Sequence, residues 1–221
     1  MTKHSLKTME KIDTKQIVAN GYDNIAEQHE EWASNVRIEE RAKYTSILLD
    51  KLPEGADVLE LGCGSGIPTT QQLAEKFSVT GVDISAKQVE LAQQRVPAAK
   101  FIHSDMTQLD FPEASFDAVA AFYSMIHVPR QEQEELFRKI SSWLRPEGLL
   151  VITMGANSIE AYYNENFLGK PMYWSHFDSE TNRRIIKKAG FSIISAIDET
   201  ADEFEKPITF LWVVAKKSVT A

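Results

Sequence analysis

Short apolar runs alternate with amphipathic segments along most of the chain. The apolar runs are DVLEL at 57–61, SVTGVD at 78–83, KFIHSD at 100–105, FDAVAAFY at 116–123 and GLLVITM at 148–154. Segments with helical spacing lie between them, over 68–76, 86–95 and 130–144. Buried strands that alternate with helices are typical of a parallel β-sheet covered by helices on both faces. The pattern therefore predicts an α/β three-layer sandwich.

The two ends of the chain follow other patterns. Residues 15–52 have helical spacing and predict two or three helices, after a polar leader at 1–14 whose composition is compatible with disorder. The segment 155–177 is rich in Tyr, Asn and Phe without clear strand alternation, and we interpret it as an inserted lid. Asp178 or Ser179 then caps a basic helix. The runs FSIISAID and PITFLWVVAKK predict two last strands that form a hairpin around the acidic loop DETADEFEK.

Composition limits the classes of protein to which the chain can belong. With 221 residues and 43% hydrophobic content, we expect residues 15–221 to form a single domain. The net charge of −8 disfavours nucleic acid as a partner. The single cysteine, Cys63, excludes an internal disulfide and a cysteine-based metal site, and we expect no bound metal. Because the sequence has neither a signal-like apolar core nor an apolar run of about 20 residues, we expect a cytoplasmic protein without a membrane partner.

Residues 58–69, VLELGCGSGIPT, lead from an apolar strand through Gly62, Gly64 and Gly66 toward a helix. Glycine lets the backbone approach a ligand with no Cβ in the way, and the N-terminus of the helix offers unpaired N–H groups. These features indicate a loop that binds a nucleotide cofactor, with a tight turn that binds no ligand as the alternative. A dinucleotide fingerprint would place its third glycine where this chain has Ile67.

Polar and aromatic residues stand at the ends of the predicted strands. Glu60, Asp83 and Asp105 end three of them, and Phe122 and Tyr123 end the next. In an open parallel sheet these ends meet at one edge, where ligands bind. Asp83 follows the first glycine by about 20 residues, where a carboxylate can accept hydrogen bonds from both hydroxyls of a ribose.

The residues around Asp105 fit an adenine. The Asp105 carboxylate is placed to accept a hydrogen bond from an exocyclic amine, and Ile84 and Met106 are placed to sandwich the ring by apolar contact. Each acid taken alone is an ordinary exposed residue at a strand end. Their joint occurrence at successive strand ends favours a binding site.

The motifs ELGCGSG, GVDIS, HSDM and FDAVAAFYSMIHV, followed by LRPEGLLVIT, resemble those of the class I S-adenosylmethionine-dependent methyltransferases, in the small-molecule branch. The resemblance covers about residues 17–152. It implies a Rossmann-like sheet of seven strands, mostly parallel with the last strand antiparallel, a helical N-terminal lid, and S-adenosylmethionine as the cofactor.

The resemblance also implies roles for individual residues. It places Glu60 and Gly62 near the methionine amino group, Asp83 on the ribose, and Asp105 with Met106 at the adenine. The segment GYDNIAE resembles the aromatic lid segment of the family, which places Tyr22 near the sulfonium. We expect the cofactor-binding residues to be Tyr22, Glu60, Gly62, Cys63, Gly64, Gly66, Asp83, Ile84, Gln88, Asp105, Met106, Phe122 and Tyr123.

Methyl transfer to an oxygen, nitrogen or sulfur atom of a small-molecule acceptor needs a positioned nucleophile without its proton. A partly buried imidazole titrates near the working pH, so His127 is our first candidate for the general base and His176 the second. The alternative for His127 is a structural role as a helix cap or a carbonyl partner. We expect Trp32, Tyr173 and Trp174 to contact a flat acceptor, unless they merely pack the lid onto the sheet.

Two other functions remain open. A nicotinamide-dependent oxidoreductase could use the same fold, but Ile67 and Asp105 argue against it. A non-catalytic cofactor-binding module would keep the glycine loop without an acceptor pocket. A cavity beside the methyl position would favour catalysis over such a module. Residues 122–125 lack the proline-rich motif of DNA amino-methylating enzymes, which also disfavours a nucleic-acid substrate.

Overall fold

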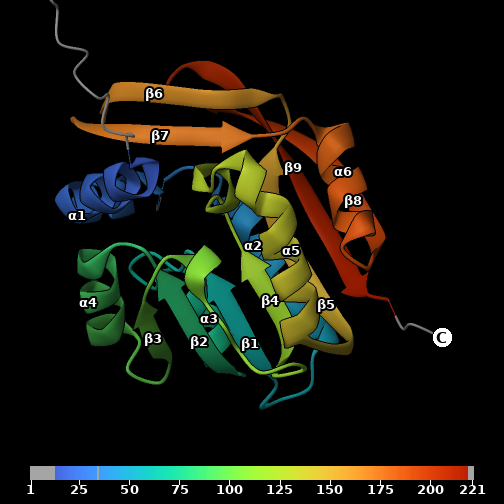
Figure 1. The fold of residues 1–221 in the computed structure, drawn as a ribbon. Helices are drawn as coiled ribbons and strands as arrows, with labels where there is room; N and C mark the ends of the chain where they lie inside the picture. The colour runs from blue at the N-terminus through green and yellow to red at the C-terminus, as the bar shows by residue number, and fades with distance from the viewer. Residues whose placement is uncertain (1–12, 34, 219–221) are drawn as a thin grey trace, which may run out of the picture.

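The main sheet has seven strands in the order β3-β2-β1-β4-β5-β9-β8 in the computed structural model, which describes residues 13–33 and 35–218 (Figure 1). Neighbouring strands from β3 to β5 run parallel, whereas β9 runs antiparallel to both β5 and β8. This topology confirms the predicted mostly parallel sheet with an antiparallel last strand. The bounds are β1 Asp57–Leu61, β2 Ser78–Asp83, β3 Lys100–His103, β4 Phe116–Ala121, β5 Leu144–Gly155, β8 Phe191–Glu203 and β9 Lys206–Lys217.

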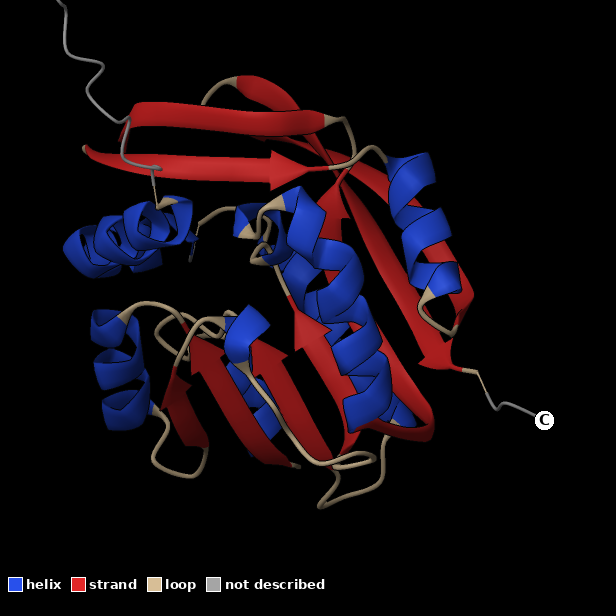
Figure 2. Cartoon of the chain, in the orientation of Figure 1, coloured by secondary structure: helices blue, strands red, loops and turns tan. Residues whose placement is uncertain are grey.

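Helices cover both faces of this sheet (Figure 2). On one face α5 and α6 bury Phe137, Ile140 and Ile186 against the sheet, and on the other α2 and α3 bury Leu48 and Leu73. Successive strand residues point to opposite faces, which explains why the predicted strands are apolar at almost every position. The helices are α1 Thr14–Ala33, α2 Ile38–Lys51, α3 Thr69–Ala74, α4 Ala86–Arg95, α5 Arg130–Trp143 and α6 Ser179–Lys188, with the short 3₁₀ helices η1 Met106–Gln108 and η2 Met125–His127.

The predicted helix signals have a local basis in side-chain caps. Ser85 accepts a hydrogen bond from the backbone of Gln88 at the start of α4, and Asp178 accepts one from Thr181 at the start of α6. The N-terminal region contains two helices, α1 and α2. Most of the predicted polar leader, residues 1–12, lies outside the described residues. Among the described residues, no helix is long and apolar enough to cross a membrane.

The inserted segment, which has no clear strand alternation in its sequence, is a β-hairpin. Strands β6 (Ile159–Phe167) and β7 (Lys170–His176) form a separate two-stranded antiparallel sheet. The hairpin lies beyond the carboxyl ends of the parallel strands and packs on α1 (Figure 1). Strand β6 is largely exposed, so no buried face imposed an alternating pattern on its sequence.

The predicted hairpin at the C-terminal end is confirmed, but its strands are longer than expected. Most of the acidic stretch predicted as a loop belongs to β8, which continues to Glu203, and β9 resumes at Lys206. Phe204 and Glu205 form the two-residue turn, with φ values of 51° and 61°. A two-residue turn with positive φ at both positions matches the right-handed twist of its flanking strands. The turn holds the Phe204 side chain at the far end of the hairpin.

Candidate active site

A cavity of about 610 Å³ lies at the carboxyl ends of the central strands, beneath α1 and the β6–β7 hairpin. This volume is typical of small-molecule sites. Gly66 and Tyr173 do not line the cavity. The other predicted site residues do: Tyr22, Trp32, Glu60, Gly62, Cys63, Gly64, Asp83, Ile84, Gln88, Asp105, Met106, Phe122, Tyr123, His127, Trp174 and His176.

The three loop glycines have different surroundings. Gly62 has φ +78°, and a Cβ there would lie 2.2 Å from the Cβ of Ser124. Gly64 has φ +54°, and the nearest atom to its hypothetical Cβ is Gln88 Oε1 at 3.9 Å, so its backbone faces open space. Gly66 instead packs against Ala92 and Val96 of α4. Gly62 and Gly64 therefore shape the cavity, whereas Gly66 allows the loop to pack closely on α4.

The carboxyl group of Glu60 is buried at the carboxyl-terminal part of β1. Burial raises its pKa to about 8, although the Thr70 hydroxyl, which donates a hydrogen bond to it, and the Arg41 guanidinium both favour the charged form. The free protein therefore holds Glu60 largely protonated at neutral pH. A cationic group entering the cavity would favour the ionised carboxylate.

Asp83 ends β2 with each of its carboxylate oxygens bonded to the backbone. One oxygen accepts the N–H of Gly64 at 2.8 Å and the other accepts the N–H of Ser85 at 2.9 Å. Burial raises the pKa of Asp83, and these two N–H groups oppose the rise. Because a carboxylate oxygen has two lone pairs, each oxygen can still accept a hydrogen bond from a ligand.

Gln88 on α4 is 1% exposed, and neither its Nε2 nor its Oε1 has a hydrogen-bond partner among the described residues. Buried amide groups without partners are rare in folded proteins because burying an unpaired polar group costs stability. Gln88 lines the same part of the cavity as Gly64. This part of the cavity therefore has an unused donor and an unused acceptor for a polar ligand.

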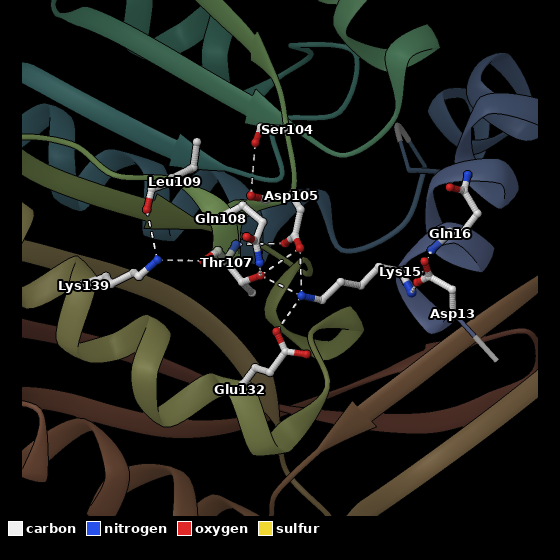
Figure 3. A network of polar contacts seen from close by, with 10 residues as sticks. All are labelled: Asp13, Lys15, Gln16, Ser104, Asp105, Thr107, Gln108, Leu109, Glu132 and Lys139. Atoms are coloured by element: carbon white, nitrogen blue, oxygen red, sulfur yellow. Dashed lines mark hydrogen bonds and ion pairs between the residues drawn. The ribbon is translucent and has the colours of Figure 1, made fainter. Parts of the chain in front are cut away.

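Asp105 belongs to a network of polar contacts that joins three elements (Figure 3). Its carboxylate accepts the N–H and the hydroxyl of Thr107, at 2.9 and 2.8 Å, and pairs with Lys15 Nζ of α1 at 2.8 Å. Lys15 also contacts Glu132 of α5. The carboxylate predicted to meet an adenine amine thus already holds α1 in place, and Ile84 and Met106 line the cavity nearby.

Phe122 and Tyr123 directly follow β4. They line the cavity and also pack with the hydrophobic cluster on the α2 and α3 side of the sheet. Phe122 packs edge-on to Trp212, with ring centroids 5.0 Å apart. Tyr123 has φ +58°, and its hydroxyl donates to Glu40 at 3.1 Å. Burial raises the pKa of the Tyr123 hydroxyl, which stays protonated. Both side chains are fixed by packing, so they form a rigid wall of the cavity.

Tyr22 and His127 form a buried pair between α1 and η2. His127 Nδ1 lies 2.7 Å from the carbonyl of Tyr173, so this nitrogen carries the proton and donates. Its Nε2, 2.9 Å from the Tyr22 oxygen, accepts the Tyr22 hydroxyl. Burial lowers the pKa of His127 to about 4 and raises the pKa of Tyr22, so both groups are neutral. The structure thus brings together the residues predicted for the sulfonium end and for the general base.

His176 lies at the end of β7 above the end of β5. Its Nδ1 lies 2.6 Å from the carbonyl of Asn157, to which it donates a hydrogen bond. Burial lowers the pKa of His176, while the carbonyl groups of Asn157 and Phe177 raise it. Both histidines predicted as candidate bases therefore face the same cavity, but they have different partners.

Aromatic side chains from four elements close the outer part of the cavity. Phe167 of β6 contacts Trp32 of α1 and Trp174 of β7 edge-on, with ring centroids 6.0 and 5.2 Å away. Phe204 stacks on Trp32 at 5.4 Å. The neighbouring side chain of Tyr173 packs against Tyr163 instead. Because adjacent strand residues point to opposite sides, Tyr173 and Trp174 do not both face the cavity.

The sequence prediction missed the basic residues of the cavity, among them Arg41 and Lys15. Arg41 of α2 donates to the carbonyl of Ala33 at 2.9 Å and lies 5.0 Å above the ring of Tyr123. Among the described residues no carboxylate lies within ion-pair distance of Arg41, and burial lowers its pKa. Lys15 was missed as well. Both are polar residues of amphipathic helices, and no local motif distinguishes them from solvent-facing lysines and arginines.

A family model described as a methyltransferase domain matches residues 58–148, which include most of β1, the glycine loop, Asp83 and Asp105. This region of the chain is a methyltransferase domain of the class I S-adenosylmethionine-dependent family. S-adenosylmethionine is the cofactor of this family. The match to a methyltransferase domain argues against the alternative of a nicotinamide-dependent oxidoreductase.

Curated relatives of this methyltransferase family member act on different acceptors. It is 36% identical over 141 residues to 2-methyl-6-phytyl-1,4-hydroquinone methyltransferase of Synechocystis, covering 58% of this chain and 43% of the relative. It is 32% identical over 160 residues to 27-O-demethylrifamycin SV methyltransferase of Amycolatopsis mediterranei, covering 63% of this chain and 58% of the relative. The chain thus spans about half the length of these relatives.

A solved methyltransferase has the same fold. The magnesium protoporphyrin IX methyltransferase from Synechocystis PCC 6803, with bound S-adenosylmethionine, matches with a TM-score of 0.70 and 20% identity, over 96% of this chain and 100% of that one. The cavity of the present chain fits such a cofactor, because Gln88 has unpaired amide groups and the Asp83 oxygens have free lone pairs. Among the described residues, no group of three His, Cys, Asp or Glu side chains is arranged to hold a metal ion.

Proposed function

We propose that this protein transfers the methyl group of S-adenosylmethionine to an oxygen, nitrogen or sulfur atom of a small-molecule acceptor. The observation that carries the proposal is the continuity of the cavity, which runs from the glycine loop and Asp83 to the aromatic side chains of the β6–β7 hairpin. A module that only bound the cofactor would need the part around the glycine loop and Asp83, but not the part lined by aromatic side chains. The aromatic part therefore favours catalysis over a non-catalytic module.

The inner part of the cavity supplies the groups that would bind the cofactor. Asp83 would accept the ribose hydroxyls, and Gln88 would contact the adenine side with its unpaired amide. Glu60 would take the methionine amino group. Arg41, whose guanidinium faces the cavity without a carboxylate partner, would take the methionine carboxylate. These contacts involve both charges of the methionine moiety and both hydroxyls of the ribose.

The outer part of the cavity would hold the acceptor and exclude water. When bound, the cofactor supplies a methyl group on a positively charged sulfur, which is already activated for transfer. The contribution of the chain is to align the acceptor atom and keep solvent away. Tyr22, Trp32 and Trp174 close this part from α1 and from the hairpin. The Tyr22 hydroxyl, fixed by its donation to His127 Nε2, leaves its oxygen free to accept a hydrogen bond.

Calorimetric titration of the purified chain with S-adenosylmethionine, S-adenosylhomocysteine and NAD tests the proposal. We expect the two sulfur-containing nucleosides to bind in the micromolar range and NAD to give no heat of binding. A screen of acceptors by formation of S-adenosylhomocysteine then tests turnover. Binding of NAD alone would overturn the proposal, and cofactor binding without turnover of any acceptor would support the non-catalytic module.

A further inference from the structure

The position of His176 is set by the backbone at the end of β5. A Cβ on Gly155, the last residue of that strand, would lie 2.0 Å from His176 Nδ1, so the imidazole ring rests on the strand where only glycine leaves room. The hydrogen bond from Nδ1 to the carbonyl of Asn157 fixes the tautomer. The lone pair of the ring is therefore on Nε2.

His176 Nε2 faces open space. It has no hydrogen-bond partner among the described residues. It is also not one of the fully buried polar atoms there that lack a partner. The residue as a whole is 6% exposed and lines the cavity. The cavity is the open space beside this residue, above β5 and next to Trp174.

His127 lacks this freedom. Its Nδ1 donates to the carbonyl of Tyr173 and its Nε2 accepts the hydroxyl of Tyr22. To take up a proton at Nε2, His127 would first have to lose the Tyr22 hydroxyl as a donor. Of the two histidines, His176 has the available basic nitrogen.

The space around His176 Nε2 suits a flat and uncharged molecule. Trp174, two residues before His176 on the same face of β7, supplies aromatic surface, which Phe167 and Trp32 continue farther along the hairpin. Of the carboxylates that line the cavity, Glu203 is paired with Arg37 and Glu30 with Arg95. A neutral phenol is a weak nucleophile and its phenolate a strong one, so a phenol benefits more from a base than an amine or thiol does.

We propose that His176 Nε2 removes the proton from the acceptor during methyl transfer, and that the acceptor is a flat, apolar molecule with a phenol-type hydroxyl. The inference rests on the proposed methyltransferase function. The hydroxyl oxygen forms a bond to the methyl carbon as the sulfur–carbon bond breaks, and the bonding electrons return to sulfur. The hydroxyl proton goes to His176 Nε2, and the imidazolium later releases it to water. The products are the aryl methyl ether and S-adenosylhomocysteine.

The ionisable groups on elements packed against His176 do not compete for this proton. His127 on η2 is neutral, and Glu160 on β6 is paired with Arg130 at the start of α5. Asp178 caps α6. Because the pKa of His176 is lowered by burial, the imidazole is neutral at pH 7. We expect the rate to fall in acid, as the pH drops through the lowered pKa of His176 and the base becomes protonated.

Two phenols of similar size test the proposal on the full chain. At about pH 8, 4-nitrophenol is largely ionised without a base, whereas 4-methylphenol is not. We expect His176→Gln to bind S-adenosylhomocysteine like the wild type but to methylate 4-methylphenol at least about 100-fold more slowly. The loss for 4-nitrophenol should be much smaller. Imidazole in solution should partly restore His176→Ala, and His103→Gln, at the exposed end of β3, is the histidine control.

The outcomes distinguish the role of His176 and the acceptor class from the proposed methyltransferase function. An equal loss for both phenols, or no loss, would overturn the role of His176 as the base. A wild-type protein that binds S-adenosylhomocysteine but methylates neither phenol would overturn the acceptor class and leave the proposed function standing. Failure of the wild type to bind S-adenosylhomocysteine would overturn the proposed function itself.

Discussion

The inner and outer parts of the cavity are built from different material. The inner part, with Glu60, Gly64 and Asp83, stands on strand ends and loops of the main sheet. Backbone N–H groups hold the Asp83 carboxylate, and the Thr70 hydroxyl holds Glu60. The outer part is made of aromatic side chains on α1, the β6–β7 hairpin and the β8–β9 turn. The rigid part suits a cofactor that is the same throughout the family. The part made of side chains suits an acceptor that differs between relatives.

Replacing Gly62 gives the largest effect expected in the inner part. We expect Gly62→Ala to lower the free energy of unfolding by about 2–4 kcal/mol. The new Cβ would collide with Ser124, and the alanine would have to adopt a left-handed backbone conformation. Gly64→Ala, also at positive φ but with open space, is the matched control and should cost about 1–2 kcal/mol. Urea unfolding measures both. Equal losses would show that the collision with Ser124 is relieved by local movement.

Asp83→Ala should weaken binding of S-adenosylhomocysteine by about 1.5–3 kcal/mol, because the charge-assisted hydrogen bonds to the ribose are lost. Calorimetry measures the affinity, and circular dichroism shows whether the variant is folded. Ser104→Ala is a control from the neighbouring strand end, because its hydroxyl donates only to the backbone of Asp105. Unchanged affinity in folded Asp83→Ala would remove Asp83 from the ribose site.

Glu60 is expected to couple cofactor binding to the release of a proton. Because burial raises the pKa of Glu60 to about 8, the carboxyl is protonated in the free protein at pH 7, and a bound ammonium group would expel that proton. We expect release of up to about one proton per cofactor in titrations with buffers of different ionisation enthalpy. Glu60→Gln should abolish the release, and equal release in both proteins would assign the proton to another group.

The same pKa predicts how stability depends on pH. The unfolded chain loses the Glu60 proton near its ordinary pKa of about 4.3, whereas the folded chain keeps it until about pH 8. The free energy of unfolding contributed by this group therefore falls as the pH rises between those values, by up to about 1.4 kcal/mol per unit. Glu60→Gln should remove that slope in urea titrations of the free protein.

The smallest effect on the cofactor is expected from the outer part. Trp174→Ala removes aromatic surface from the hairpin and should change the affinity for S-adenosylhomocysteine by no more than about 0.5 kcal/mol, because Trp174 stands on β7 and not on the strand ends that would bind the cofactor. The same titration measures it. A loss as large as that of Asp83→Ala would break the division into two parts.

The strand-end residues of the inner part could be predicted from the sequence, whereas the structure of the segment that carries the outer aromatic side chains could not. Strand-end positions such as Asp83 follow from a hydrophobic pattern of buried strands, because the ends of parallel strands meet at one edge. The β6–β7 hairpin left no such pattern, since most of β6 is exposed. Arg41 and Lys15 reach the cavity only through the packing of helices far from the glycine loop in sequence. Tyr173 and Trp174 could be separated only when the direction of each side chain in β7 was known.

Helix α1 spans both parts of the cavity. Its 20 residues extend for about 30 Å, with Lys15 paired to Asp105 at one end, Tyr22 in the middle and Trp32 among the aromatic side chains at the other. Because α1 is one continuous helix, a shift of α1 toward one ligand also changes its contact with the other. Cofactor and acceptor should therefore show thermodynamic coupling: whatever factor the first adds to the affinity of the second, the second must add to the first.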